Sequence, residues 1–128
     1  MNNTNRSWNI LNWNIRGINS KDKWLAVRQK IDESDCNILS LQETKREIFD
    51  AAYLKKIPSR LNKFAFLPSV GASGGLLVAW NGSQFSGEVI AQNRFSLSVQ
   101  FTSLLSNQSW IISNIYGLCD PQDKIEFI

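Results

Sequence analysis

Three polar side chains lie where short strand-like segments end, and their types suit phosphate and metal chemistry: Asn14, Glu43 and Tyr116. A carboxylate at the end of a buried strand faces the crevice where α/β sheets bind ligands. It can hold Mg²⁺, which takes hard oxygen ligands. An asparagine amide can orient a phosphate or a metal-bound water, and a tyrosine hydroxyl can donate to a phosphoryl oxygen. These residues form the candidate site.

Each of the three residues also has a commoner structural explanation. Taken alone, Glu43 could simply be an exposed carboxylate at the end of a strand. Asn14 could belong to the turn before Gly17, where asparagine is common. Tyr116 could be an aromatic residue at a strand end with its hydroxyl in water. Asn14 and Glu43 together support a binding site more strongly than either does alone, because the ends of neighbouring parallel strands lie at one edge of a sheet. The segment SGGLLVAW could let a backbone approach a ligand. It lacks the spacing of a phosphate-binding glycine loop, so we interpret it as the start of a strand.

The composition excludes some catalytic mechanisms but does not indicate a binding partner. The chain of 128 residues has 14 Lys and Arg against 11 Asp and Glu, a net charge of +3, and no basic run. This charge is compatible with binding to a polyanion such as nucleic acid, but it does not by itself indicate such binding. Histidine is absent, which excludes a Ser/His or Cys/His triad. Cys36 and Cys119 show no metal-ligand spacing and are predicted to be reduced, buried thiols.

The sequence shows no segment that would direct it to a membrane. No apolar stretch has the length of a membrane span, and the start MNNTNRSWNIL has no apolar core of a signal peptide. We therefore expect an intracellular protein, cytoplasmic or nuclear, with no membrane partner.

A strand, a helix and a second strand are predicted to position Asn14 and Glu43. Trp8 to Ile15 nearly alternates apolar residues with asparagine, as in a strand with one buried face. A helix capped by Asn19 or Ser20 follows over Lys21–Glu33. The segment Asn37–Glu43 has the apolar run of a strand buried on both faces. This βαβ unit predicts parallel strands.

After Glu43 the sequence predicts one more helix and then a series of short strands. A second helix is predicted over Lys45–Lys56. Short strand-like runs then follow, with turn residues between them, which favours antiparallel hairpins. Trp80-Asn81-Gly82 predicts a tight hairpin. Asp120-Pro121 predicts the start of a short helix. The tryptophans are interpreted as core residues rather than platforms for bases: Trp13, Trp24, Trp80 and Trp110.

Taken in order, these motifs resemble those of the endonuclease/exonuclease/phosphatase family. WNIRGI contains Asn14, LQET contains Glu43 and NIYG contains Tyr116, with SGGLLVAW matching the family's central hairpin. The phrases WNIRGINSKDKW, LQETK and NIYG followed by DPQDK are most similar to the endonuclease domain of plant non-LTR (LINE-type) retrotransposons. The resemblance covers almost the whole chain.

The resemblance implies an α/β (α+β) four-layer sandwich and phosphodiester hydrolysis that depends on Mg²⁺ or Mn²⁺. By this likeness Glu43 would ligate the metal, Asn14 would help to position metal-bound or phosphate oxygens, and Tyr116 would contact the scissile phosphate. DNA would be the substrate, and a reverse transcriptase domain is expected downstream in an intact element. The metal would act as a Lewis acid on the phosphate.

The sequence departs from the family pattern after Tyr116. The family's Asp-x-Asn motif and its Asp–His pair are not found, because Asp120 and Asp123 come too early and histidine is absent. We therefore expect residues 1–128 to be the N-terminal portion of one domain, truncated at its C-terminus and inactive alone. The expected fold is a partial sandwich, mainly the first β-sheet with flanking helices. The second sheet would be largely missing, leaving an apolar face exposed.

Two alternatives remain open at this point. One is a non-enzymatic α/β binding or interaction module that holds no metal. The other is a different phosphoesterase of the same family, a phosphatase or an exonuclease. The response of the protein to Mg²⁺ separates the first alternative from the nuclease hypothesis.

Overall fold

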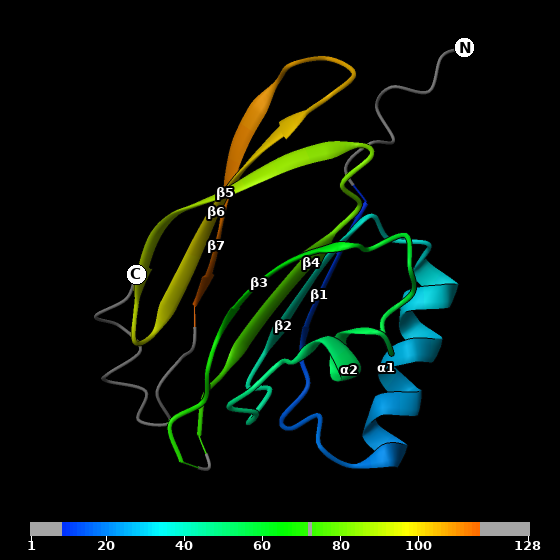
Figure 1. The fold of residues 1–128 in the computed structure, drawn as a ribbon, viewed down its shortest axis with the longest axis vertical. Coiled ribbons are helices and arrows are strands. Elements are labelled where there is room, and N and C mark those ends of the chain that lie inside the picture. The colour runs from blue at the N-terminus through cyan, green and yellow to red at the C-terminus, as the bar shows by residue number, and fades with distance from the viewer. Residues whose placement is uncertain (1–8, 72, 116–128) are drawn as a thin grey trace.

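Two β-sheets lie face to face, and helices cover the outer face of one of them (Figure 1). This computed structural model describes residues 9–71 and 73–115. One sheet has the order β1-β2-β4-β3 and the other the order β5-β6-β7. The elements are β1 (Ile10–Asn14), α1 (Lys21–Ser34), β2 (Ile38–Gln42), α2 (Ala51–Leu54), β3 (Lys63–Leu67), β4 (Leu76–Trp80), β5 (Phe85–Asn93), β6 (Ser96–Ser103) and β7 (Ser109–Ile115). The predicted α/β class and partial sandwich are confirmed.

The predicted βαβ unit is present at the start of the fold. β1 and β2 run parallel, with Asn14 opposite Gln42. Helix α1 begins after Ser20, whose side chain accepts a hydrogen bond from the Lys23 amide at 3.1 Å. A polar cap of this kind satisfies an amide that the helix itself leaves unpaired. The helix buries one apolar stripe against the sheet, made of Trp24, Val27 and Ile31.

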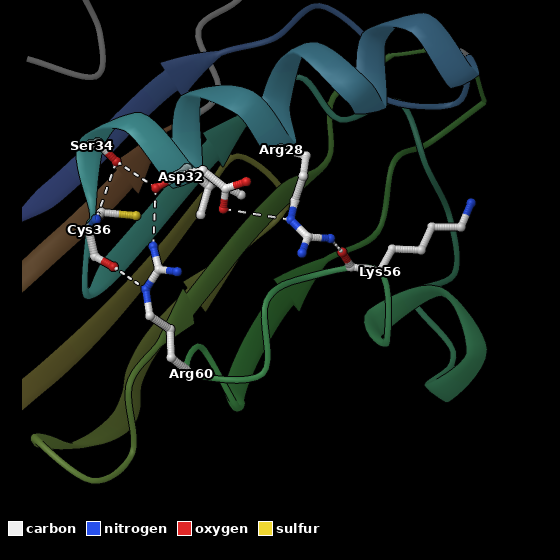
Figure 2. Close-up of polar contacts among 7 residues, drawn as sticks. Arg28, Asp32, Ser34, Cys36, Lys56 and Arg60 are labelled. Atoms are coloured by element: carbon white, nitrogen blue, oxygen red, sulfur yellow. Dashed lines mark hydrogen bonds and ion pairs between the residues drawn. The ribbon is translucent and has the colours of Figure 1, made fainter.

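Two arginines fix α1 to the segment that follows α2 (Figure 2). Arg60 donates from Nε to the Cys36 carbonyl oxygen at 3.2 Å and from Nη2 to the Ile31 carbonyl oxygen at 3.1 Å. Arg28 is exposed and donates from Nη1 to the Lys56 carbonyl oxygen at 2.9 Å. The Ile31 carbonyl oxygen also accepts from the Asp35 amide at 3.1 Å at the end of α1, whereas Cys36 and Lys56 lie outside the helices and strands.

The helix predicted over Lys45–Lys56 shrinks to the single turn α2, so that prediction was wrong over its first half. Lys45 has a φ of 56°, which is left-handed, and its amide donates to the Gly74 carbonyl oxygen at 2.8 Å. The short helix starts where the Asp50 side chain accepts from the Tyr53 amide at 2.8 Å. The first half of the segment pairs with a distant part of the chain, and this tertiary contact overrides local helix propensity.

The later strands form as predicted, and β3 with β4, β5 with β6 and β6 with β7 pair antiparallel. The tight hairpin predicted at Trp80-Asn81-Gly82 was wrong, because the flanking strands β4 and β5 belong to different sheets. Neither Asn81 nor Gly82 has the positive φ that such a hairpin needs. Instead Asn81 Oδ1 accepts from the Ser83 amide at 2.9 Å, and the Asn81 carbonyl oxygen accepts from the Phe85 amide at 3.0 Å. This turn carries the chain from one sheet to the other.

Apolar side chains fill the space between the two sheets. The rings of Trp80 and Phe101 meet edge to face, with centroids 5.2 Å apart. The expectation that the second sheet is largely missing was wrong, because β5, β6 and β7 cover the inner face of the first sheet. The two sides of this core are Ile38, Leu76, Val78 and Trp80 from the first sheet and Phe85, Leu97, Val99 and Phe101 from the second. All four named tryptophans pack into core clusters, as predicted.

Several predictions concern residues that the structure does not describe. Tyr116, Cys119 and the short helix after Asp120 lie outside the described ranges. Cys36 is a free and fully buried thiol, in agreement with the sequence prediction. Among residues 9–71 and 73–115, no helix combines the length and the apolar character needed to cross a bilayer.

The packing of the second sheet is tested by one substitution made at two sites. Leu97 in β6 is 1% exposed, whereas Leu105 in the β6–β7 turn is 69% exposed. We expect Leu97→Ala to lower the free energy of unfolding by about 2–5 kcal/mol through loss of contacts and a cavity. The same change at Leu105 should alter it by less than about 0.5 kcal/mol. Urea denaturation measures both, and equal effects would contradict the inter-sheet core.

Candidate functional site

The parallel strands β1 and β2 bring Asn14 and Glu43 to the same end of the first sheet. Asn14 is the last residue of β1, and Glu43 follows directly after the last residue of β2. Both residues line a groove of about 510 Å³ between the two sheets. The opposite wall of this groove is the end of β7, from Ile112 to Ile115. Tyr116 lies outside the described residues, so its relation to the groove stays a prediction.

The inner faces of β2 and β7 change from apolar to polar toward this groove. On β2 the inward positions are Ile38, Ser40 and Gln42, and on β7 they are Trp110, Ile112 and Asn114. Side chains two residues apart share one face of a strand, so each of these strands contributes its polar end to the same place. The edge strand β1 lines the groove with Ile10, Asn12 and Asn14, which are all exposed.

Backbone hydrogen bonds on both sides hold Glu43 at the groove. The Gly17 amide donates to the Glu43 carbonyl oxygen at 2.7 Å, and the Ile18 amide donates to the Thr44 carbonyl oxygen at 3.1 Å. On the other side the Thr44 amide donates to the Gly75 carbonyl oxygen at 3.1 Å. Glu43 itself has a φ of 54°, an uncommon conformation for a residue with a side chain. The pairing beyond the strand maintains this conformation and leaves the half-buried carboxylate at the groove.

The glycine pair Gly74-Gly75 does more than start a strand, which was the interpretation from sequence. Both glycines have positive φ, 79° and 95°. A Cβ on Gly75 would lie 2.3 Å from Thr44 Oγ1 and 3.2 Å from the Lys45 amide nitrogen. Only a residue without a side chain allows this approach. Gly75 is therefore a site residue that sequence reasoning missed, because it positions the backbone next to Glu43.

A network of amide side chains forms part of the groove lining. Gln42 Nε2 donates to Asn114 Oδ1 at 2.7 Å and also to Asn12 Oδ1. Since Gln42 belongs to the first sheet and Asn114 to the second, the bond joins the two sheets at their polar end. Sequence reasoning did not select these three residues. No local signal could have found the pair of Gln42 and Asn114, because the two residues are 72 positions apart in the sequence.

Arg46 and Tyr53 anchor the loop that follows Glu43. The Arg46 guanidinium lies 3.6 Å from the centre of the Tyr53 ring, and its Nη1 donates to Asn19 Oδ1 at 3.0 Å. The Tyr53 hydroxyl donates to the Ile18 carbonyl oxygen at 3.3 Å. Burial raises the pKa of Tyr53 above its usual 10.0, and the charge of Arg46 opposes that rise. Tyr53 therefore stays neutral at physiological pH and keeps its hydroxyl as a donor.

The oxygen donors in the groove suit a single Mg²⁺ or Mn²⁺ ion that retains much of its water. Within the described ranges no group of three or more His, Cys, Asp or Glu side chains is placed to enclose a metal. Mg²⁺ does not need such a cage, because it commonly binds one or two carboxylates and keeps several waters. Glu43 supplies one carboxylate and Asn14 one amide oxygen, with room for water between the sheets. The residues present fit this ion.

Solved structures of several proteins resemble this chain. The AP endonuclease LMAP from Leishmania major matches 87% of it at 17% identity with a TM-score of 0.59. A humanized D. rerio TDP2 matches 88% of it at 18% identity with a TM-score of 0.58. The 3′ phosphatase NExo from Neisseria, bound to product DNA hairpin, matches 92% of it at 19% identity with a TM-score of 0.52.

The chain has the endonuclease/exonuclease/phosphatase fold. It spans 40%, 51% and 46% of these three neighbours, respectively. No protein-family model and no curated protein matches the sequence. At these identities the likeness establishes the fold, in agreement with the resemblance found in the motifs.

The contact between Gly75 and Thr44 is tested with Gly71 as a matched control. Both glycines have positive φ, but a Cβ on Gly71 would meet nothing within 4 Å. We expect Gly71→Ala to lower the free energy of unfolding by about 1–2 kcal/mol from backbone strain alone. Gly75→Ala should lower it by about 1–3 kcal/mol more because of overpacking.

A double-mutant cycle in thermal or urea unfolding isolates the clash. Adding Thr44→Ala to Gly75→Ala should recover part of the loss, because Thr44 Oγ1 is the nearest atom. Equal losses at Gly71 and Gly75, with no recovery, would contradict the proposed close approach.

Proposed function

We propose that this chain carries the metal- and phosphate-binding side of a divalent-metal-dependent DNA endonuclease site. The observation that supports this most directly is the meeting of Asn14 and Glu43 in one polar groove at the ends of two parallel strands. This is the place where open α/β sheets bind their ligands. Sequence resemblance in the motifs around the same two residues points to the same chemistry.

Each of the proposed site residues would have a separate role in binding the metal or the phosphate. Glu43 would hold Mg²⁺ or Mn²⁺, and Asn14 would orient a phosphate oxygen or a water of that ion. When bound, the ion would supply Lewis-acid charge to the phosphate. Tyr116 would donate a hydrogen bond to the phosphate during phosphodiester hydrolysis.

DNA is the substrate that we propose. Among the similar structures, D. rerio TDP2 is complexed with single strand DNA product and NExo is bound to product DNA hairpin. The finer proposal is an endonuclease of a plant non-LTR retrotransposon, which nicks DNA for a downstream reverse transcriptase. That proposal rests on the phrases WNIRGINSKDKW, LQETK and DPQDK.

The chain lacks the usual base of such a site, because its sequence has no histidine. A missing general base lowers the rate by roughly two to four powers of ten. We therefore propose that this chain binds DNA with the help of a metal but does not hydrolyse it efficiently by itself.

The proposal is tested by removing the charge of Glu43 alone. Glu43→Gln keeps the size of the side chain but replaces the charged carboxylate with a neutral amide, which is a weaker ligand for Mg²⁺. We expect Mg²⁺ to strengthen binding of the wild-type protein to a fluorescent DNA duplex, and Glu43→Gln to abolish that gain. Fluorescence anisotropy in Mg²⁺ and in EDTA at one fixed ionic strength measures the gain.

Glu47→Gln is the matched control, because Glu47 is exposed on the same loop and does not line the groove. This variant should keep the full effect of Mg²⁺. Binding that is indifferent to Mg²⁺ and to Glu43 would favour a non-enzymatic module instead. Robust nicking of supercoiled plasmid that Glu43→Ala abolishes would contradict the claim of inactivity while supporting the metal site.

A further inference from the structure

A second, smaller pocket of about 160 Å³ lies between the loop that joins β3 to β4 and the turn that joins β5 to β6. The loop contributes Gly74 and Gly75 to its lining, and the turn contributes Arg94 and Phe95. Figure 1 shows this loop and this turn in the lower half of the view, where β2 and β7 also end. The strand register agrees, because β4 starts opposite the end of β2 and β6 starts opposite the end of β7. The pocket therefore lies at the same end of the sandwich as the groove.

The glycine pair connects this pocket to the loop that carries Glu43. The Gly75 carbonyl oxygen accepts from the Thr44 amide at 3.1 Å, and the Gly74 carbonyl oxygen accepts from the Lys45 amide at 2.8 Å. Paired backbones lie about 4.7–4.9 Å apart. One wall of the pocket is thus a single strand spacing from the backbone that follows the proposed metal ligand.

Arg94 is the charged residue of the pocket, and its side chain is exposed. Its guanidinium lies over the Phe95 ring, 4.9 Å from the ring centre. Asn93 Oδ1 accepts from the Phe95 amide at 2.8 Å, which fixes the turn around Arg94. Within residues 9–71 and 73–115 no carboxylate pairs with this guanidinium, and no Asp or Glu lines the pocket. An arginine stacked on an aromatic ring keeps its N–H groups available for an acceptor.

The surroundings of Arg94 indicate what this acceptor is. A guanidinium with no carboxylate beside it favours an anion, and its planar fork suits phosphate oxygens. Successive phosphates of one DNA strand are about 3.4 Å apart along the helix axis. A strand with one phosphate at Glu43 therefore carries further phosphates within reach of the neighbouring pocket.

We infer that Arg94 binds a backbone phosphate of DNA that flanks the phosphate held in the groove. This inference rests on the proposed function and deepens it, because it extends the substrate-binding surface to the turn between β5 and β6. Phe95 acts as a positioning residue that supports the guanidinium. Arg94 binds no metal in this arrangement, so its contribution to DNA affinity adds to that of Glu43.

The first test measures how DNA affinity depends on salt, by fluorescence anisotropy with a DNA duplex at one fixed Mg²⁺ concentration. Each phosphate that a cation neutralises contributes about 0.9 to the slope of log affinity against log salt. Arg94→Ala should therefore reduce this slope by about one and weaken binding roughly threefold or more. Arg94→Lys should keep most of the slope, because it keeps the charge, but lose affinity with the planar fork.

Lys30→Ala is the matched control, because it removes the same single charge. Lys30 is exposed on α1 and lines neither the groove nor the pocket. This variant should leave the slope unchanged and the affinity within twofold of the wild type.

The second test observes wild-type Arg94 directly, so that it does not depend on the folding of a variant. The side-chain Nε–H signal of Arg94 is assigned by ¹⁵N NMR, and the tetranucleotide d(TpTpTpT) is added with Mg²⁺. This signal should shift with the tetranucleotide. It should shift far less with the same sequence joined by uncharged methylphosphonate linkages.

The outcomes separate the inference from the proposed function. An unchanged salt slope in Arg94→Ala, or an Arg94 signal that does not move, would overturn the inference. If binding still depends on Mg²⁺ and Glu43, the proposed function stands in that case. Equal losses of slope in Lys30→Ala and Arg94→Ala would also overturn the inference, by assigning the effect to net charge alone. Absence of any DNA binding by the wild-type protein would overturn both.

Discussion

The continuation of backbone pairing past the end of β2 is the constraint on which the site depends. β2 is paired on both sides, with β1 in parallel and with β4 antiparallel. The pairing extends beyond the strand through Glu43 and Thr44, which bond to Gly17 on one side and Gly75 on the other. The left-handed φ of Glu43 is unfavourable for a residue with a side chain, and the hydrogen bonds of the neighbouring backbone maintain it. The position of the carboxylate is thus set by main-chain bonds on both flanks.

Local signals predicted the elements well where each element depends on its own residues. The Ser20 cap defined the start of α1, and apolar alternation located the strands. The predictions failed where a distant partner decides the structure. Lys45 looks helical in sequence, yet it bonds to Gly74, which no local pattern reveals. Asn81-Gly82 signals a turn correctly, but a turn signal cannot say that the strands on either side join different sheets.

The same distinction divides the site residues. The positions of Asn14 and Glu43 at one end of the first sheet were predictable, because each ends a strand-like run within a motif of its own. Gln42 and Asn114 were not, since their role exists only in a hydrogen bond between positions 72 residues apart. Gly75 was seen but misinterpreted, because the need for glycine arises from the Thr44 side chain beside it. A charged residue at a strand end can be selected from the sequence alone. The residues that position it can be identified only from contacts in the folded structure.

The polar end of the inter-sheet space explains why the site lies where it does. A β-sandwich is stabilised by apolar inner faces, yet β1, β2 and β7 give up apolar residues at the same end: Asn14, Gln42 and Asn114. Of the three, only Asn114 is buried, at 3% exposed, and it forgoes the burial energy of about 1.5–3 kcal/mol that a buried aliphatic side chain contributes. The hydrogen bond from Gln42 offsets part of this cost and joins the two sheets at their polar end. The aromatic core around Trp80 and Phe101 holds the sheets together beside it.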